Sequence, residues 1–186
     1  MAESWQESLK ILKDGNLQFL HQKKSKLEHN IEDLQELKEG QNPHAIIICC
    51  ADSRVSPDII FNQYIGDLFV IQNAGNVCDT SVLGSVQYAL QYLGTPLVVV
   101  LGHSLCGAVS AAHKNKQVKG PLKSIVDMID SHVVATSIDD SIRNHAKQSA
   151  EEICKLLEPY ESLLEQTVKV LPAYYDICSG EVGWLN

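Results

Sequence analysis

Residues typical of metal sites follow two apolar runs that lie far apart in this chain. The first run, "AIIICC", continues into "CADSR", which brings Cys50, Asp52 and Arg54 close together in the sequence. The second run, "TPLVVVLG", continues into "HSLC", which contains His103 and Cys106. Thiolate and imidazole groups suit Zn²⁺, and a site with three such ligands keeps a fourth position open for water. The two segments together predict a catalytic zinc site.

The carboxylate and guanidinium of the first segment are expected to control that open position. A free carboxylate beside a metal ion can bind it, whereas one held by a guanidinium can instead accept a hydrogen bond from a metal-bound water. An exposed ion pair would contribute little, but Asp52 and Arg54 come directly after an apolar run. With two thiolate ligands the zinc keeps little positive charge, so an orienting Asp52 would help a zinc-bound hydroxide to attack a small, uncharged carbon electrophile.

Three short runs rich in valine and isoleucine supply the strands that would hold these residues, at positions 44–50, 67–75 and 95–102. Continuous apolarity is typical of strands buried on both faces of a parallel sheet. Ligands bind beyond the carboxyl ends of such strands, so neighbouring strands would bring Cys50 and His103 to one edge. Successive strand residues face opposite sides, which predicts that Cys49 packs in the core.

The remaining segments predict helices around this sheet. A crossover helix is expected from an N-cap at Asp79 to a stop at Gly94, because its apolar residues recur at helical spacing. Further helices are expected at 108–112, 121–131 and 138–159. An N-terminal helix interrupted by Gly15 precedes a second helix that starts at Asn30 and stops at Gly40. The last twenty residues indicate a strand, a turn at Ser179–Gly180 and a short final strand.

The fold class expected is therefore α/β, with a mostly parallel central β-sheet, crossover helices, an N-terminal helical arm and a C-terminal edge strand. At 186 residues the chain suits one domain, with the arm over 1–40 and a zinc-binding α/β core over 41–186. A hydrophobic fraction of 45% and a charged fraction of 20% are those of an ordinary globular protein.

The net charge and the cysteine content indicate which classes of partner and which cellular compartment to expect. The formal net charge of -8 disfavours nucleic acid and anionic membranes as partners, since phosphates attract basic patches. The first residues lack the basic and apolar regions of a signal peptide, and no apolar run is long enough to span a bilayer, so we expect a cytoplasmic location. There the six cysteines are expected to stay reduced.

The motifs and their order resemble the β-class carbonic anhydrases, a family marked by Cys-x-Asp-x-Arg followed by His-x-x-Cys. The similarity extends over nearly the whole chain, through "DGNLQFL", "GDLFVIQNAGNV", "GHSLCGAV" and "AYYDICSGEVGWL". It implies that one Zn²⁺ per chain is bound by Cys50, His103 and Cys106, with Asp52 and Arg54 as the dyad that gates the fourth position. The reaction it implies is the reversible hydration of carbon dioxide to bicarbonate and a proton.

The resemblance also implies an assembly and a substrate contact. Family members form a homodimer, or a dimer of dimers, with the active site at the subunit boundary and N-terminal helices that wrap the partner. Gln63 matches the glutamine that the family places near the substrate. Gln72 stands where relatives often carry arginine, a difference that bears on local electrostatics and not on the zinc ligands.

Three alternatives remain open at this stage. On the same fold, a similar zinc centre hydrolyses carbonyl sulfide or carbon disulfide. A non-catalytic zinc site would need a fourth ligand, for which Cys49 and Cys78 are candidates. "GHSLC" also imitates a nucleophile elbow with Ser104 as the nucleophile, although its last position is not glycine. The histidines available to such a serine are His113, His132 and His145.

Overall fold

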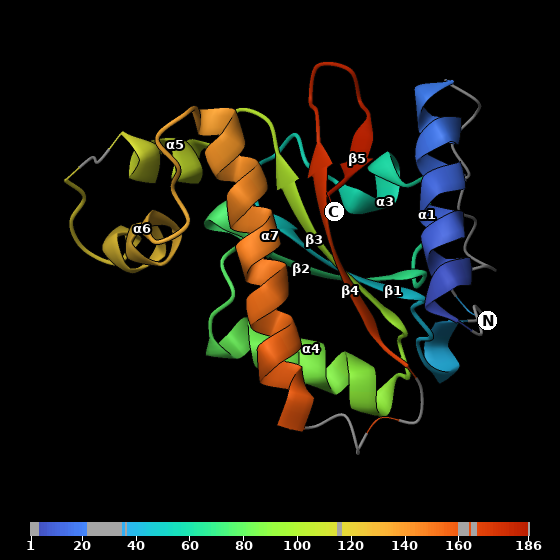
Figure 1. Cartoon of the computed structure of the whole chain (residues 1–186). Helices are drawn as coiled ribbons and strands as arrows, with labels where there is room; N and C mark the ends of the chain where they lie inside the picture. Colours follow the sequence, from blue (N-terminus) through green and yellow to red (C-terminus); the bar gives the residue numbers. More distant parts are fainter. Residues whose placement is uncertain are drawn as a thin grey trace.

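The computed structural model describes residues 4–21, 35, 37–114, 117–159, 164 and 167–185. At its centre is a five-stranded sheet in the order β2-β1-β3-β4-β5 (Figure 1). The strands are β1 (Ala45–Cys50), β2 (Leu68–Asn73), β3 (Leu97–His103), β4 (Lys169–Tyr175) and β5 (Val182–Trp184). Strands β1 to β4 are parallel to their neighbours, and β5 pairs antiparallel with β4. The α/β fold with a C-terminal edge strand is therefore confirmed.

The helices follow the expected order, with one addition. They are α1 (Trp5–Leu20), α3 (Pro57–Ile60), α4 (Thr80–Tyr92), α5 (Gly107–His113), α6 (Leu122–Asp130) and α7 (Ile138–Leu157), with 3-10 turns η1 (Leu37–Glu39) and η2 (Ala74–Asn76). Asp79 caps α4 as expected and accepts hydrogen bonds from the amides of Ser81 and Val82. Helix α3 was not expected, because a single turn is too short to show a helical period.

The second N-terminal helix, expected from Asn30, falls mostly outside the described residues. Within the described part of the chain, no helix combines the length and the apolarity needed to cross a membrane.

Strand β1 is buried on both faces, which explains its continuous apolar sequence. Ala45, Ile47 and Cys49 pack in the cluster that includes Leu12 of α1. Ile46 and Ile48 point the other way, into a cluster with residues of α4 and α7. Figure 1 shows the same layers, with α4 and α7 on one side of the sheet and α1 on the other. The last residue of β1, Cys50, belongs to a third cluster formed with α5, α6 and α7.

The interruption expected at Gly15 is wrong, since α1 continues through this residue. The glycine is needed for close packing instead: a Cβ atom at Gly15 would lie 1.8 Å from the carbonyl oxygen of Phe61. The next residue, Asn16, donates to the carbonyls of Ile60 and Gly180, 3.1 and 3.0 Å away. Helix α1 is therefore fixed to the α3 segment and to the C-terminal turn.

Replacing Gly15 with alanine is expected to destabilise the chain by about 3 kcal/mol, because backbone must move to admit the methyl group. The matched control is Gly84→Ala in α4, where the new Cβ would have no described atom within 4 Å apart from the adjoining backbone of its own helix. That change is expected to raise stability by about 0.5–1 kcal/mol, the usual preference for alanine in a helix. Urea unfolding of both variants measures the difference, and equal stabilities would contradict the packing account.

Candidate metal centre

The carboxyl ends of β1 and β3 bring together the three residues predicted to bind metal. These strands are parallel neighbours, with Cys49 opposite Leu101. Cys50 ends β1, His103 ends β3, and Cys106 caps the start of α5. One ligand atom from each of the three lies within 4.8 Å of the others, and all three residues are buried. A set of two thiols and one imidazole at this spacing suits Zn²⁺.

His103 presents the nitrogen that a metal would need. Its Nδ1 lies 2.9 Å from the carbonyl oxygen of Ser104, and a carbonyl only accepts, so Nδ1 carries the proton. The tautomer leaves a lone pair on Nε2, which is buried without a hydrogen-bond partner among the described residues. An imidazole whose one nitrogen donates to a carbonyl while the other is left bare is typical of a metal ligand.

The two thiols of the cluster interact, and the interaction shifts their pKa values in opposite directions. The pKa of Cys50 is well below its usual range, first because Cys106 donates a hydrogen bond to it and also because of the nearby His103 and the Gly75 amide. The pKa of Cys106 is raised by the same interaction and by burial. The amide nitrogen of Gly75 lies 3.3 Å from the Cys50 sulfur. These contacts favour the thiolate form of Cys50, and a dication bound here would favour loss of the proton from Cys106 as well.

Asp52 and Arg54 form a two-pronged ion pair beside this cluster. The guanidinium Nε lies 2.8 Å from Asp52 Oδ1, and Nη2 lies 2.8 Å from Oδ2. The Arg54 amide also donates to Oδ1 over 3.0 Å. These contacts hold the pKa of Asp52 well below its usual range. The side chains are 18% and 47% exposed, so the pair lies where the cluster meets solvent.

The sequence matches the carbonic anhydrase family over residues 45–182, a range that includes the cluster and the ion pair. The chain belongs to the β-class carbonic anhydrases. A crystal structure of a β-carbonic anhydrase from Aspergillus fumigatus superposes with a TM-score of 0.71 at 28% identity, covering 83% of this chain and 81% of that one.

Curated carbonic anhydrases of mycobacteria are also similar to this chain. Carbonic anhydrase 2 of Mycobacterium tuberculosis is 48% identical over 103 residues, which are 55% of this chain and 50% of that protein. This chain thus spans about half the length of that relative. The carbonic anhydrase of Mycolicibacterium smegmatis is 32% identical over 184 residues, covering 93% of this chain and 89% of the relative.

Strand β1 ends in two adjacent thiols, Cys49 and Cys50, that the structure separates. Cys49 lies in the core cluster on the α1 side of the sheet, and burial raises its pKa to about 12. Cys78 packs on the opposite face, where burial likewise raises its pKa to about 12. Neither belongs to the cluster of three. The expectation that Cys49 packs in the core is confirmed, and a closed structural site with Cys49 or Cys78 as the fourth ligand gains no support.

Gln72, the position that differs from many family members, supports the loop after β1. Its amide nitrogen lies 3.3 Å from the carbonyl oxygen of Cys50 and 3.2 Å from that of Val55. These contacts bracket the turn that holds Asp52 and Arg54. A neutral glutamine therefore supplies backbone hydrogen bonds at this place, and adds no charge to the metal centre.

Gln63 is not brought to the cluster within one chain. Its Oε1 lies 3.0 Å from His44 Nε2, and its Nε2 donates to the carbonyl of Phe61 over 2.6 Å. His44 precedes β1 and Cys50 ends it, so the two ends are about 20 Å apart at the usual rise of a strand. A substrate contact by Gln63 stays a prediction, and it would need the site of another subunit.

Within the described part of the chain, Ser104 has no histidine or carboxylate as a hydrogen-bond partner. Its hydroxyl oxygen accepts a hydrogen bond of 2.9 Å from the amide of Ile177. The three downstream histidines have other partners: His113 bonds Ser141, and His132 and His145 bond each other. The elbow alternative is therefore not supported.

Two backbone features of the centre escaped the sequence analysis. The Gly75 amide that donates to Cys50 belongs to a glycine with φ of 77°, and Leu105 adopts φ of 62° between His103 and Cys106. A left-handed conformation is unfavourable for leucine, and it turns the chain so that both ligands face one point. The glycine in "NAG" was a detectable signal, whereas nothing in a leucine indicates this conformation.

Proposed function

We propose that this chain catalyses the reversible hydration of carbon dioxide to bicarbonate and a proton, with one zinc ion per chain held by Cys50, His103 and Cys106. The observation that carries the proposal is the buried cluster of two thiols and an imidazole, with its bare Nε2. Membership of the carbonic anhydrase family supports the same reaction.

Each residue around the cluster has a part in this chemistry. Bound there, zinc would supply a Lewis acid that makes a water molecule acidic near neutral pH. Asp52 is ionised, so it can accept a hydrogen bond from that water and orient it. Arg54 donates a hydrogen bond to each carboxylate oxygen of Asp52. These bonds restrain Asp52 from binding the metal itself. The apolar cluster of α5, α6 and α7 encloses the thiols and suits an uncharged substrate.

Stopped-flow measurement of carbon dioxide hydration by the zinc-loaded chain tests this proposal. We expect a hydration rate proportional to the concentration of zinc-loaded protein. Carbonyl sulfide and carbon disulfide should be assayed on the same preparation, because a similar centre hydrolyses them. Rapid hydrolysis of either one without hydration of carbon dioxide would overturn the assignment of substrate.

Activity is expected to rise between about pH 6.5 and about pH 9. The ion pair lowers the pKa of Asp52, so this carboxylate stays ionised across the whole interval and does not produce the rise. The rise instead belongs to the group that the metal acidifies, which must lose a proton before it can attack. A rate profile that is flat over this interval would contradict this role for the metal.

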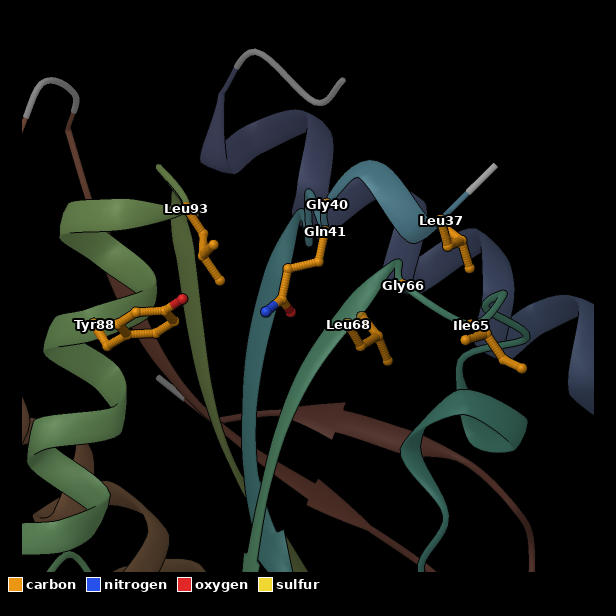
Figure 2. A pocket seen from close by; sticks show the side chains of 8 residues that line it. All are labelled: Leu37, Gly40, Gln41, Ile65, Gly66, Leu68, Tyr88 and Leu93. Carbon is orange, nitrogen blue, oxygen red and sulfur yellow. The ribbon is translucent and has the colours of Figure 1, made fainter. Parts of the chain in front are cut away.

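We also propose that the chain forms a homodimer or a dimer of dimers. Strand β2 is an edge strand of the sheet, and unpaired edges are usually covered. Beside it lies a hollow of about 630 Å³ with Tyr88 and Leu93 on one side and Leu37 and Ile65 on the other (Figure 2). Ile65 is 52% exposed, and exposed apolar side chains around such a hollow favour contact with another subunit.

Two further proposals concern the chain as a whole. We propose a single domain, since the strands of one sheet come from both halves of the sequence. We propose a cytoplasmic location as well, because thiolate ligands must stay reduced and the six cysteines are free.

A further inference from the structure

A line of hydrogen bonds runs from the surface of α7 to the sulfur of Cys50. Oε1 of Glu152 lies 3.1 Å from Nε2 of His132. Nδ1 of His132 lies 2.8 Å from Nδ1 of His145. Nε2 of His145 lies 2.8 Å from the carbonyl oxygen of Gly75, whose own amide donates to Cys50. Both histidines are buried, and the proposed reaction gives them no part.

The carbonyl of Gly75, at one end of this line, determines which nitrogens of His145 and His132 carry a proton. The Gly75 carbonyl only accepts, so Nε2 of His145 must carry a proton. Burial lowers the pKa of His145 to about 4, so the ring is neutral and its Nδ1 accepts. Nδ1 of His132 must then donate. Nε2 of His132 lies 3.1 Å from Oε1 of Glu152, so contacts on both ring nitrogens hold His132 in the orientation that presents Nδ1 to His145.

Gly75 is held on both sides. Its carbonyl meets His145 and its amide meets the Cys50 sulfur. A Cβ atom there would lie 2.7 Å from Cδ1 of Ile129 and 2.9 Å from Cβ of Ala108. The residue therefore fits closely between α5 and α6, and its left-handed conformation sets the direction of the amide. Losing the bond to His145 would free one end of this short turn.

We propose that His145 is a positioning residue that aims the Gly75 amide at the Cys50 thiolate, and that His132 and Glu152 fix the tautomer of His145 that this requires. The proposal rests on the proposed role of Cys50 as a zinc ligand. A hydrogen bond from an amide withdraws electron density from a thiolate, so the three residues would weaken electron donation from sulfur to the metal. Outer partners of metal ligands commonly tune a centre in this way.

Nitrogen NMR of the imidazole rings tests the proton positions directly, with or without metal. Near neutral pH we expect His145 to be protonated on Nε2 alone and His132 to carry a proton on Nδ1. A His145 ring protonated on Nδ1 alone would overturn the proposal, because it could not then donate to Gly75.

Cobalt-substituted protein tests the effect on Cys50. A thiolate that loses a hydrogen bond is easier to oxidise, so its charge-transfer band to Co²⁺ moves to longer wavelength. We expect His145→Leu to shift the band in this direction. His145→Gln, whose amide can replace the Nε2 donor, should restore the band of the unmodified chain. His113→Leu is the matched control, since His113 bonds the hydroxyl of Ser141, and should leave the band in place.

The outcomes separate this inference from the proposed function. A cobalt thiolate band that His145→Leu leaves unmoved overturns the positioning role and keeps the zinc site. If His145→Leu does not fold, His145→Gln still tests the proposal. A cobalt thiolate band that moves to longer wavelength in His145→Gln would overturn the positioning role. The absence of any thiolate band in the unmodified chain would overturn the zinc ligation itself, and the inference with it.

Discussion

Replacing Cys50 with serine is expected to abolish zinc binding and carbon dioxide hydration together. The side chain supplies the thiolate of the cluster, and a serine hydroxyl is a far poorer ligand because it does not ionise near neutral pH. His103→Ala and Cys106→Ser should have the same effect, since each removes one of three ligands. Zinc content by atomic emission and the initial rate of hydration measure the two losses on one sample.

The matched control for this change lies next to it in the chain. Cys49→Ala alters the same residue type in the same strand, but Cys49 faces the opposite cluster. It should keep one zinc per chain and full activity, at a loss of about 1 kcal/mol in stability. Full zinc content in Cys50→Ser, or loss of zinc from Cys49→Ala, would show that the two thiols have been assigned the wrong way round.

Replacing Asp52 with alanine is expected to leave zinc in place and to reduce turnover about a hundredfold or more, the usual range for a positioned group that takes part in proton transfer. Asp52 lies outside the cluster of three, so its loss removes no ligand. It removes the carboxylate that would orient the attacking water. Steady-state hydration rates, normalised to zinc content, measure the effect.

Asp58→Asn is a suitable control for the loss of this carboxylate. Asp58 follows the same strand, in α3, and burial raises its pKa. Asp58 takes no part in the ion pair between Asp52 and Arg54. The Asp58→Asn variant should therefore hydrate carbon dioxide at the normal rate. Undiminished activity in Asp52→Ala would refute the orienting role, and equal losses in both variants would indicate a general effect of lost negative charge.

The local pattern of the sequence was enough to predict the strands and to identify the three residues that the fold brings together. Two of the continuous apolar runs form the buried strands β1 and β3, whereas the third forms the edge strand β2, which is only partly buried. The alternation of side chains along β1 separated Cys49 from Cys50. The two motifs at the strand ends form one cluster provided that β1 and β3 are neighbours in the sheet, and the structure shows that they are. These features depend on residues close in sequence, so a pattern can reveal them.

Contacts between distant segments could not be predicted in this way. The sequence predicts a break at Gly15, because nothing nearby in it shows that the carbonyl of Phe61 packs against this glycine. The pairing of His132 with His145 likewise depends on how the loop after α6 meets α7. The position of Gln63 depends on the segment between α3 and β2, which returns the chain to the amino end of β1.

Titration of the metal-free chain with zinc shows whether an ion held by Cys50, His103 and Cys106 is required for the reaction. The rate of carbon dioxide hydration should rise in proportion to added zinc and level off at one ion per chain. Cys50→Ser, titrated alongside, should show no such rise. A full rate of carbon dioxide hydration without zinc would contradict the proposed role of the metal. So would a chain that takes up one zinc ion and remains inactive.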